Sequence, residues 1–154
     1  MKTLNESFEA LILKGHFEEA KKITKKLASK ELRDALFRIA YDRNSIAPYG
    51  FICFLLQGKE TPQLHTIAAV LLSHGINHLP NAYNLALYHA RRATEMSPDW
   101  ENKEYLLFFH ELPEKLISDE EALKIAKEIL KINSNSKAAK EILEELSKKK
   151  VKSQ

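Results

Sequence analysis

The sequence is poor in cysteine, glycine and proline, and each shortage narrows what the chain can be. Its 154 residues include one cysteine, four glycines and five prolines. Because Cys53 has no second cysteine to pair with, no disulfide can form within the chain, and we expect a cytoplasmic protein in a reducing compartment. The shortage of glycine and proline leaves long stretches without the residues that end helices.

Long apolar runs are also missing. The most apolar stretch, residues 47–56, is about half of the roughly 20 residues that a membrane-spanning helix needs. Near the N-terminus, Glu6 and Glu9 interrupt the apolar patch. We therefore expect no signal peptide and no membrane partner. The formal net charge of +3 is too small to require a nucleic-acid partner.

Sequence motifs that mark known chemistry are not found. There is no Gly-rich phosphate loop, no G-x-S-x-G elbow and no dinucleotide fingerprint. His74 and His78 have the spacing of two metal ligands on one helix face, but the glycine and asparagine between them argue against a continuous helix. We therefore predict no catalytic residue, no metal and no cofactor. An enzyme would have to gather His74, His78, His89 and His110 through its fold.

What the chain does contain is apolar residues spaced for amphipathic helices. Alanine, leucine, lysine and glutamate dominate, and no segment alternates with the period of a strand. Thr61, Ser118 and Ser97-Pro98 are placed to start helices, and Gly15 is placed to end one. The predicted fold is all-α, with about eight or nine short helices packed as antiparallel pairs. The expected helices span residues 3–14, 17–28, 30–42, 48–57, 62–75, 80–96, 101–111, 119–132 and 136–148.

Similar stretches recur along the chain. Residues 86–100 align with residues 122–136 at an offset of 36, and both stretches have alanine at the first and fifth positions. A third copy, over residues 10–27, has Ala20 in the place of Ala86, at an offset of 66. These offsets correspond to a period of about 34 residues, which is typical of a repeated helix pair. We expect the repeated alanines to be packing residues.

The copy nearest the N-terminus, "ALILKGHFEEAKKITKKL" over residues 10–27, resembles the turn and second helix of a tetratricopeptide repeat. Gly15 ends the first helix and Phe17 enters the gap between the two. The later copies resemble the same second helix and its exit. The resemblance implies an irregular α-solenoid of stacked helix pairs. The resemblance covers roughly residues 1–34 and 80–148. We expect one helical-repeat domain over residues 1–148, followed by a basic, frayed tail over residues 149–154.

The resemblance also implies a binding site. In tetratricopeptide proteins the first helix of each pair lines a concave groove that holds a partner peptide. The implied function is therefore non-catalytic binding of a protein or peptide partner. The corresponding groove residues here are Asn5, Glu9, Ile12, Asn102, Tyr105 and Phe109.

A second resemblance leads to a different partner. The stretch from residue 77 to residue 122 looks like small bacterial immunity proteins, which neutralise a cognate toxin. On that alternative the chain is a dedicated inhibitor and its partner is a toxin domain. The interface would then be tight and preformed, whereas a peptide adaptor would bind several partners more weakly.

Charge is placed unevenly along the chain. Between Asn44 and Ala90 only Lys59 and Glu60 are charged. This stretch is either the buried centre of the fold or an apolar partner surface, and a homodimer is one way to cover such a surface.

Lysines cluster in the N-terminal part and again at the C-terminal end of the chain. Such clusters can grip phosphates, but glutamates lie among them. We therefore expect solvated helix faces and no nucleic-acid partner. The lysines concerned are Lys21, Lys22, Lys25, Lys26 and Lys30 in the first cluster and residues 148–152 in the second.

Overall fold

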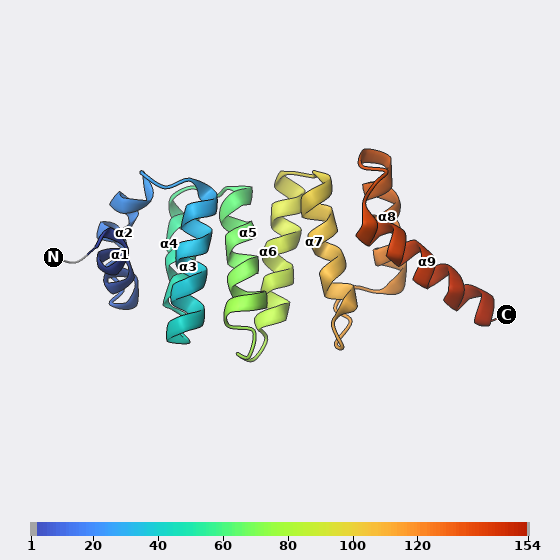
Figure 1. Cartoon of the computed structure of the whole chain (residues 1–154), viewed down its shortest axis with the longest axis horizontal. Coiled ribbons are helices and arrows are strands. Elements are labelled where there is room, and N and C mark those ends of the chain that lie inside the picture. The colour runs from blue at the N-terminus through green and yellow to red at the C-terminus, as the bar shows by residue number, and fades with distance from the viewer. Residues whose placement is uncertain (1–2, 154) are drawn as a thin grey trace. The chain divides into compact units, whose positions relative to one another are not determined.

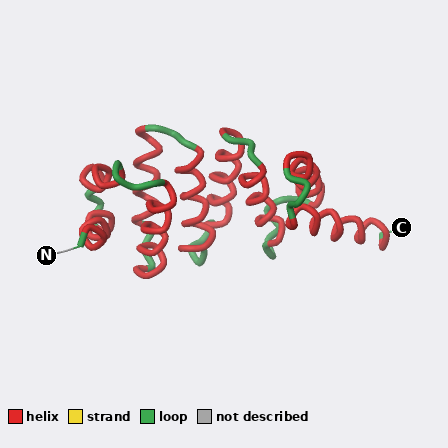
Figure 2. The backbone as a smooth tube through the Cα atoms, turned by 45° about the horizontal axis from the view of Figure 1, so that its top comes forward, coloured by secondary structure: helices red, strands yellow, loops and turns green. Residues whose placement is uncertain are grey.

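Every regular element is a helix in the part of the chain that the computed structural model describes, residues 3–153. Figure 2 shows helices joined by short loops over this range. Nine α-helices lie within these residues and neighbouring helices pack together, so the all-α prediction is confirmed. None of them has both the length and the apolar composition that crossing a membrane requires. The chain divides into two compact units, Met1–His89 (unit 1) and Ala90–Gln154 (unit 2).

Unit 1 is built around its most apolar helix. α4 contacts α1, α2, α3 and α5, and Figure 1 shows α3 and α4 side by side. Phe51 and Ile52 of α4 are fully buried, so the stretch that is nearly free of charge supplies much of the core of this unit. The helices are α1 (Leu4–Leu13), α2 (Phe17–Thr24), α3 (Ser29–Arg43), α4 (Ala47–Gly58) and α5 (Pro62–Val70), with a π-helical turn, η1 (Leu71–Gly75), continuing α5, and the first part of α6 (Ala82–Met96).

Unit 2 is organised around α8 (Asp119–Ile132), which contacts α7 (Trp100–Glu111) on one side and α9 (Lys137–Lys152) on the other. The remaining residues of α6 also belong to this unit. α9 continues through Lys152, which carries the helix into the segment predicted as a basic tail. Gln154 lies outside the described residues.

The repeated alanines are core residues in both units. Ala20 and Ala86 of unit 1 are buried, as are Ala90, Ala122 and Ala126 of unit 2. A methyl side chain lets neighbouring helices approach closely, whereas a larger side chain at a filled position would force them apart. The prediction that these alanines serve packing is confirmed.

Most of the predicted helix ends are also confirmed. Thr61 Oγ1 accepts a hydrogen bond from the Leu64 amide at 3.2 Å, and Ser118 Oγ accepts one from the Glu121 amide at 3.1 Å. Gly15 follows α1 with a φ of +74°, a left-handed conformation that glycine adopts without strain.

The helix expected over residues 101–111 is present as α7, but the cap predicted for it at Ser97-Pro98 is wrong. α7 begins two residues later, because Asp99 is the cap and its carboxylate accepts a hydrogen bond from the Asn102 amide at 2.8 Å. Ser97 donates its hydroxyl to the same carboxylate at 2.8 Å. An aspartate at this position also interacts favourably with the positive end of the helix dipole, which serine does not.

Candidate functional site

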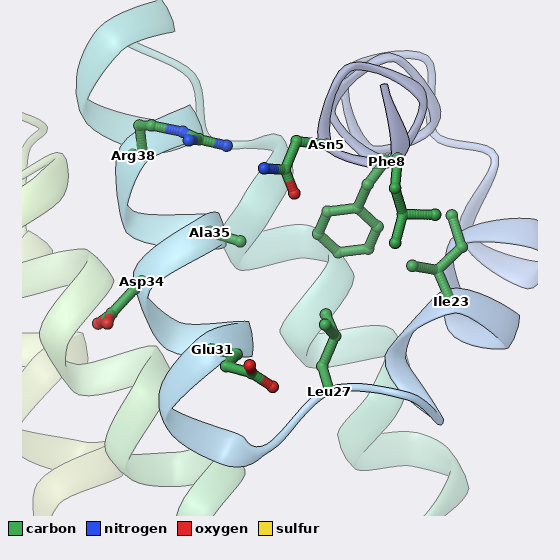
Figure 3. A pocket seen from close by; sticks show the side chains of 9 residues that line it. Asn5, Phe8, Ile23, Leu27, Glu31, Asp34, Ala35 and Arg38 are labelled. Atoms are coloured by element: carbon green, nitrogen blue, oxygen red, sulfur yellow. The ribbon is translucent and has the colours of Figure 1, made fainter. Parts of the chain in front are cut away.

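A hollow of about 500 Å³ opens between α1, α2 and α3 of unit 1 (Figure 3). We call it the α1–α3 hollow. Its apolar lining comes from all three helices and from the α2–α3 connection, and polar side chains stand around it. The apolar residues are Leu4, Phe8, Ile23, Leu27 and Ala35, and the polar ones are Asn5, Glu31, Asp34 and Arg38.

Two of the four polar residues already have partners. Glu31 Oε2 accepts a hydrogen bond from the Ala28 amide at 2.8 Å, and Asp34 pairs with Arg33 at 2.9 Å. Asn5 and Arg38 form no side-chain hydrogen bond or ion pair with any residue in the described range. Figure 3 shows the Arg38 side chain extending toward Asn5 at one end of the hollow. An amide and a guanidinium are thus open to a ligand beside an apolar surface.

The structure places the three groove residues predicted in α1 in three different environments. Asn5 is exposed and lines the α1–α3 hollow. Glu9 is half-buried and its carboxylate pairs with Arg43 of α3. Ile12 is fully buried, so it packs in the core and presents no surface to a partner.

The three groove residues predicted in α7 of unit 2 also differ in their surroundings. Asn102 donates its side-chain amide to the Ser97 carbonyl oxygen at 2.8 Å, which ties α7 to its own N-terminal turn. Tyr105 is half-buried and its ring stacks on that of Phe108, with centroids 6.0 Å apart. Phe109 is fully buried and belongs to the core of unit 2.

A second hollow, of about 420 Å³, opens in unit 1 between α2, α4 and the starts of α3 and α5. We call it the lysine hollow. Lys21, Lys25 and Lys59 stand around it, and no aspartate or glutamate is among its lining residues. The apolar part of its lining consists of Leu32, Leu55, Leu64 and Ile67.

Four polar side chains form a hydrogen-bonded chain within unit 1, which we call the histidine chain; its two histidines are buried, Tyr49 is half-buried and Glu60 is exposed. Glu60 Oε1 lies 2.9 Å from His65 Nε2, and His65 Nδ1 lies 2.8 Å from His89 Nδ1. His89 Nε2 lies 3.0 Å from the Tyr49 hydroxyl. The two imidazoles are only 3% and 4% exposed, so these contacts satisfy polar groups that would otherwise be costly to bury.

One assignment of protons satisfies every bond of the histidine chain with both imidazoles neutral. Tyr49 donates to His89 Nε2, His89 Nδ1–H donates to His65 Nδ1, and His65 Nε2–H donates to the Glu60 carboxylate. The pKa of His89 is lowered to about 4, mainly by burial and to a smaller extent by the neighbouring His65. Burial also raises the pKa of Tyr49, so the phenol stays protonated. The chain links α4, α5 and α6, and it ends at the half-buried Tyr49 hydroxyl and at the exposed Glu60 carboxylate.

The four histidines considered for catalysis have separate surroundings. His74 and His78 are exposed, and His74 Nδ1 lies 2.7 Å from the Ser73 hydroxyl. His89 belongs to the histidine chain of unit 1. His110 is buried in unit 2, with Nε2 2.7 Å from Asp119 Oδ1, and its Nδ1 has no hydrogen-bond partner within the described part of the chain. Across residues 3–153, no three His, Cys, Asp or Glu side chains are grouped to hold a metal ion.

Sequence reasoning missed the histidine chain. Its members are 5 to 40 residues apart, and they meet only because α4, α5 and α6 pack together. One signal was available, since Glu60 is one of only two charged residues in a long uncharged stretch and His65 follows it by little more than one helical turn.

No protein-family model matches the chain, and no curated protein or solved structure matches it either. The tetratricopeptide and immunity-protein resemblances stay predictions from the sequence.

Proposed function

We propose that this chain is a non-catalytic protein-binding module built from tetratricopeptide-like helix pairs. The buried alanines at repeating positions support the repeat, because small buried side chains allow neighbouring helices to pack closely. Phe17 follows the left-handed turn at Gly15 and its ring lies 5.4 Å from that of Phe51, as expected for a residue that enters the gap between helices.

The α1–α3 hollow is the observation that carries the binding function. It combines an apolar surface with two polar side chains, Asn5 and Arg38, that have no hydrogen-bond or ion-pair partner among residues 3–153. Binding sites commonly have this composition, since apolar contact supplies affinity and a few fixed polar groups supply orientation. Asn5 is also a residue for which the sequence predicted a partner-binding role.

The buried polar groups of unit 1 support a binding module more than an enzyme. In the histidine chain each imidazole nitrogen is engaged by another member. A general base needs a lone pair that faces the substrate, and neither His65 nor His89 has one left over. The chain therefore supports a structural role for these histidines.

An affinity-capture experiment with two matched variants tests the proposal. Ala35→Arg would fill the α1–α3 hollow, whereas Ala138→Arg places the same side chain at another half-buried alanine, in α9 of unit 2. We expect the wild type and Ala138→Arg to capture the same protein from the lysate of the source cell, and Ala35→Arg to lose it. Circular dichroism and thermal melting establish that both variants fold.

The number of captured partners distinguishes the two protein-binding roles. One stoichiometric protein with a toxic domain supports the dedicated inhibitor, and several proteins that share a short motif support a peptide adaptor. Retention of every partner by a folded Ala35→Arg variant would remove the α1–α3 hollow from the proposal.

A further inference from the structure

The lysine hollow carries a more specific chemistry than the α1–α3 hollow. Its apolar floor includes Leu32 and Ile67, both buried, and the half-buried Leu55 and Leu64. These four side chains come from α3, α4 and α5, so the packing of three helices fixes the floor. A hollow of about 420 Å³ lies within the range of sites that take a large apolar side chain together with its neighbours.

The charge around this floor has one sign. The ammonium groups of Lys21, Lys25 and Lys59 come from α2 and from the end of α4, and none of them forms an ion pair within residues 3–153. The adjacent carboxylate of Glu60 is engaged by His65 at 2.9 Å. Three cations that share a concave surface without a counter-ion attract an anionic ligand.

The position of Lys21 is partly fixed. Its Nζ lies 5.8 Å from the centroid of the Phe54 ring, a distance at which the ring attracts the cation. The stem of the side chain therefore has a preferred direction along α4. A lysine that is held in this way loses less conformational freedom on binding than one that projects into solvent.

We propose that the lysine hollow binds an acidic peptide segment of a partner protein, with an apolar side chain on the floor and flanking carboxylates on Lys21, Lys25 and Lys59. The lining favours such a peptide over a nucleic acid. It contains no arginine to read base edges and no aromatic ring on which a base could stack. An aliphatic floor suits leucine, isoleucine or phenylalanine instead.

This site does not depend on the α1–α3 hollow. The two hollows share no lining residue, since Ile23 and Leu27 face one while Lys21, Thr24 and Lys25 face the other. Blocking the first hollow with Ala35→Arg therefore leaves the lysine hollow open. The failure of either site can be recognised without the other.

Selection of displayed random 12-residue peptides on the intact chain tests the proposal. We expect the selected peptides to contain at least two Asp or Glu residues beside a Leu, Ile or Phe. Synthetic copies should bind in fluorescence anisotropy, and copies with Asn and Gln in place of the acids should bind about tenfold more weakly, as expected for losing several exposed ion pairs. Raising the salt from about 0.05 M to about 0.5 M should weaken binding further, because the ions screen the charges.

A triple variant places the peptide in the hollow. Lys21→Gln, Lys25→Gln and Lys59→Gln together should weaken binding of the acidic peptide about tenfold, by the same loss of ion pairs. The three Lys→Arg changes at the same positions keep the charges and should restore most of the affinity. Both variants alter exposed side chains only, and thermal melting verifies that they fold.

A second triple variant controls for the general field of the lysine cluster. Lys22→Gln, Lys26→Gln and Lys30→Gln remove the same charge from exposed positions that do not line the hollow, and should change the affinity less than twofold. Equal losses in the two Gln variants would overturn the proposal. Failure to select acidic peptides, or tighter binding of a single-stranded oligonucleotide, would overturn it as well.

Discussion

The two units of the chain differ in the balance of their charges. Unit 1 contains 11 Lys and Arg against 8 Asp and Glu, so it carries the whole formal charge of +3, whereas unit 2 contains 13 of each. Unit 2 joins its helices with ion pairs, such as Arg91 to Glu121 and Lys103 to Glu128 at 2.6 Å. Unit 1 joins α1 and α3 through the ion pair of Glu9 with Arg43, but it joins α4, α5 and α6 through the histidine chain, and it leaves Lys21, Lys25 and Lys59 exposed.

This difference separates groups that hold the fold together from groups that remain open to a ligand. Charges that are paired across helices are already satisfied, and a partner would have to compete for them. The unpaired cations around the lysine hollow offer their full interaction to an incoming anion. The comparison therefore favours unit 1 as the unit that meets a partner.

The largest expected effect is the same in both units, because their apolar cores are equally buried. Ile52 of α4 and Ile129 of α8 are both 0% exposed. Replacing either with alanine removes buried methylene and methyl groups and leaves a cavity, at a cost of about 2–5 kcal/mol in the free energy of unfolding. Urea denaturation followed by circular dichroism measures both variants.

Exposed isoleucines provide matched controls for this prediction. Ile46, which precedes α4, is 58% exposed, and Ile132, at the end of α8, is 56% exposed. Their alanine variants should cost less than about 0.5 kcal/mol, as surface changes usually do. A large loss at either control position would mean that another surface covers that side chain in solution.

The response to acid should differ between the units. The pKa of His89 is lowered to about 4 from an ordinary 6.5, so the folded chain binds fewer protons than the unfolded chain between these pH values. The contribution of His89 to stability is present above about pH 6.5 and is lost as the pH falls to about 4. It amounts to about 3 kcal/mol at most.

Replacing His89 tests this assignment. His89→Gln removes the titrating group, so the variant should lose stability less steeply between pH 6.5 and pH 4 than the wild type, as followed by urea denaturation across pH. An unchanged slope in His89→Gln would show that other groups set the acid response of unit 1.

The corresponding group in unit 2 responds at lower pH. The hydrogen bond from His110 lowers the pKa of Asp119 below its ordinary 3.8. The contribution of Asp119 to stability is therefore present above pH 3.8 and is lost only at lower pH.

The parts of this molecule that could be predicted from sequence depend on local regularities. Helix positions follow from apolar periodicity and from residues such as Thr61 and Gly15, which act within one turn of their own position. The repeated alanines were identified as packing residues for the same reason. A period reveals which side of a helix is buried before the neighbouring helix is known.

Periodicity shows which side chains share a face of a helix, but it does not show how deeply each of them is buried. Asn5 and Ile12 are seven residues apart, which places them on one face of α1, yet Asn5 lines an open hollow and Ile12 is fully buried. The difference arises from how α2, α3 and α4 are placed against each turn of α1. The histidine chain escaped prediction for a related reason, since His65 and His89 meet only after α5 and α6 are packed.

The smallest expected effect concerns the ion pairs themselves and tests the comparison most directly. Arg91 makes two hydrogen bonds to the carboxylate of Glu121 in unit 2, and this contact raises the pKa of Arg91 and lowers that of Glu121. In unit 1, Arg43 makes one such bond to Glu9 from a more exposed position. Double-mutant cycles with Arg→Met and Glu→Gln should give coupling energies of about 0.5–1 kcal/mol for the first pair and about 0.2–0.5 kcal/mol for the second.

Both ion pairs lose side-chain entropy when they form. Because Arg91 and Glu121 form two parallel hydrogen bonds and Arg43 and Glu9 form one, the first pair gains more interaction energy for a similar loss of entropy. Both coupling energies should fall in about 1 M salt, where exposed charges are screened within about 3 Å. Equal couplings in the two units, or a larger one for Arg43 and Glu9, would mean that unit 2 gains no special stability from its balanced charge. The comparison of the units would then rest on the net positive charge of unit 1 and on the lysines around the lysine hollow.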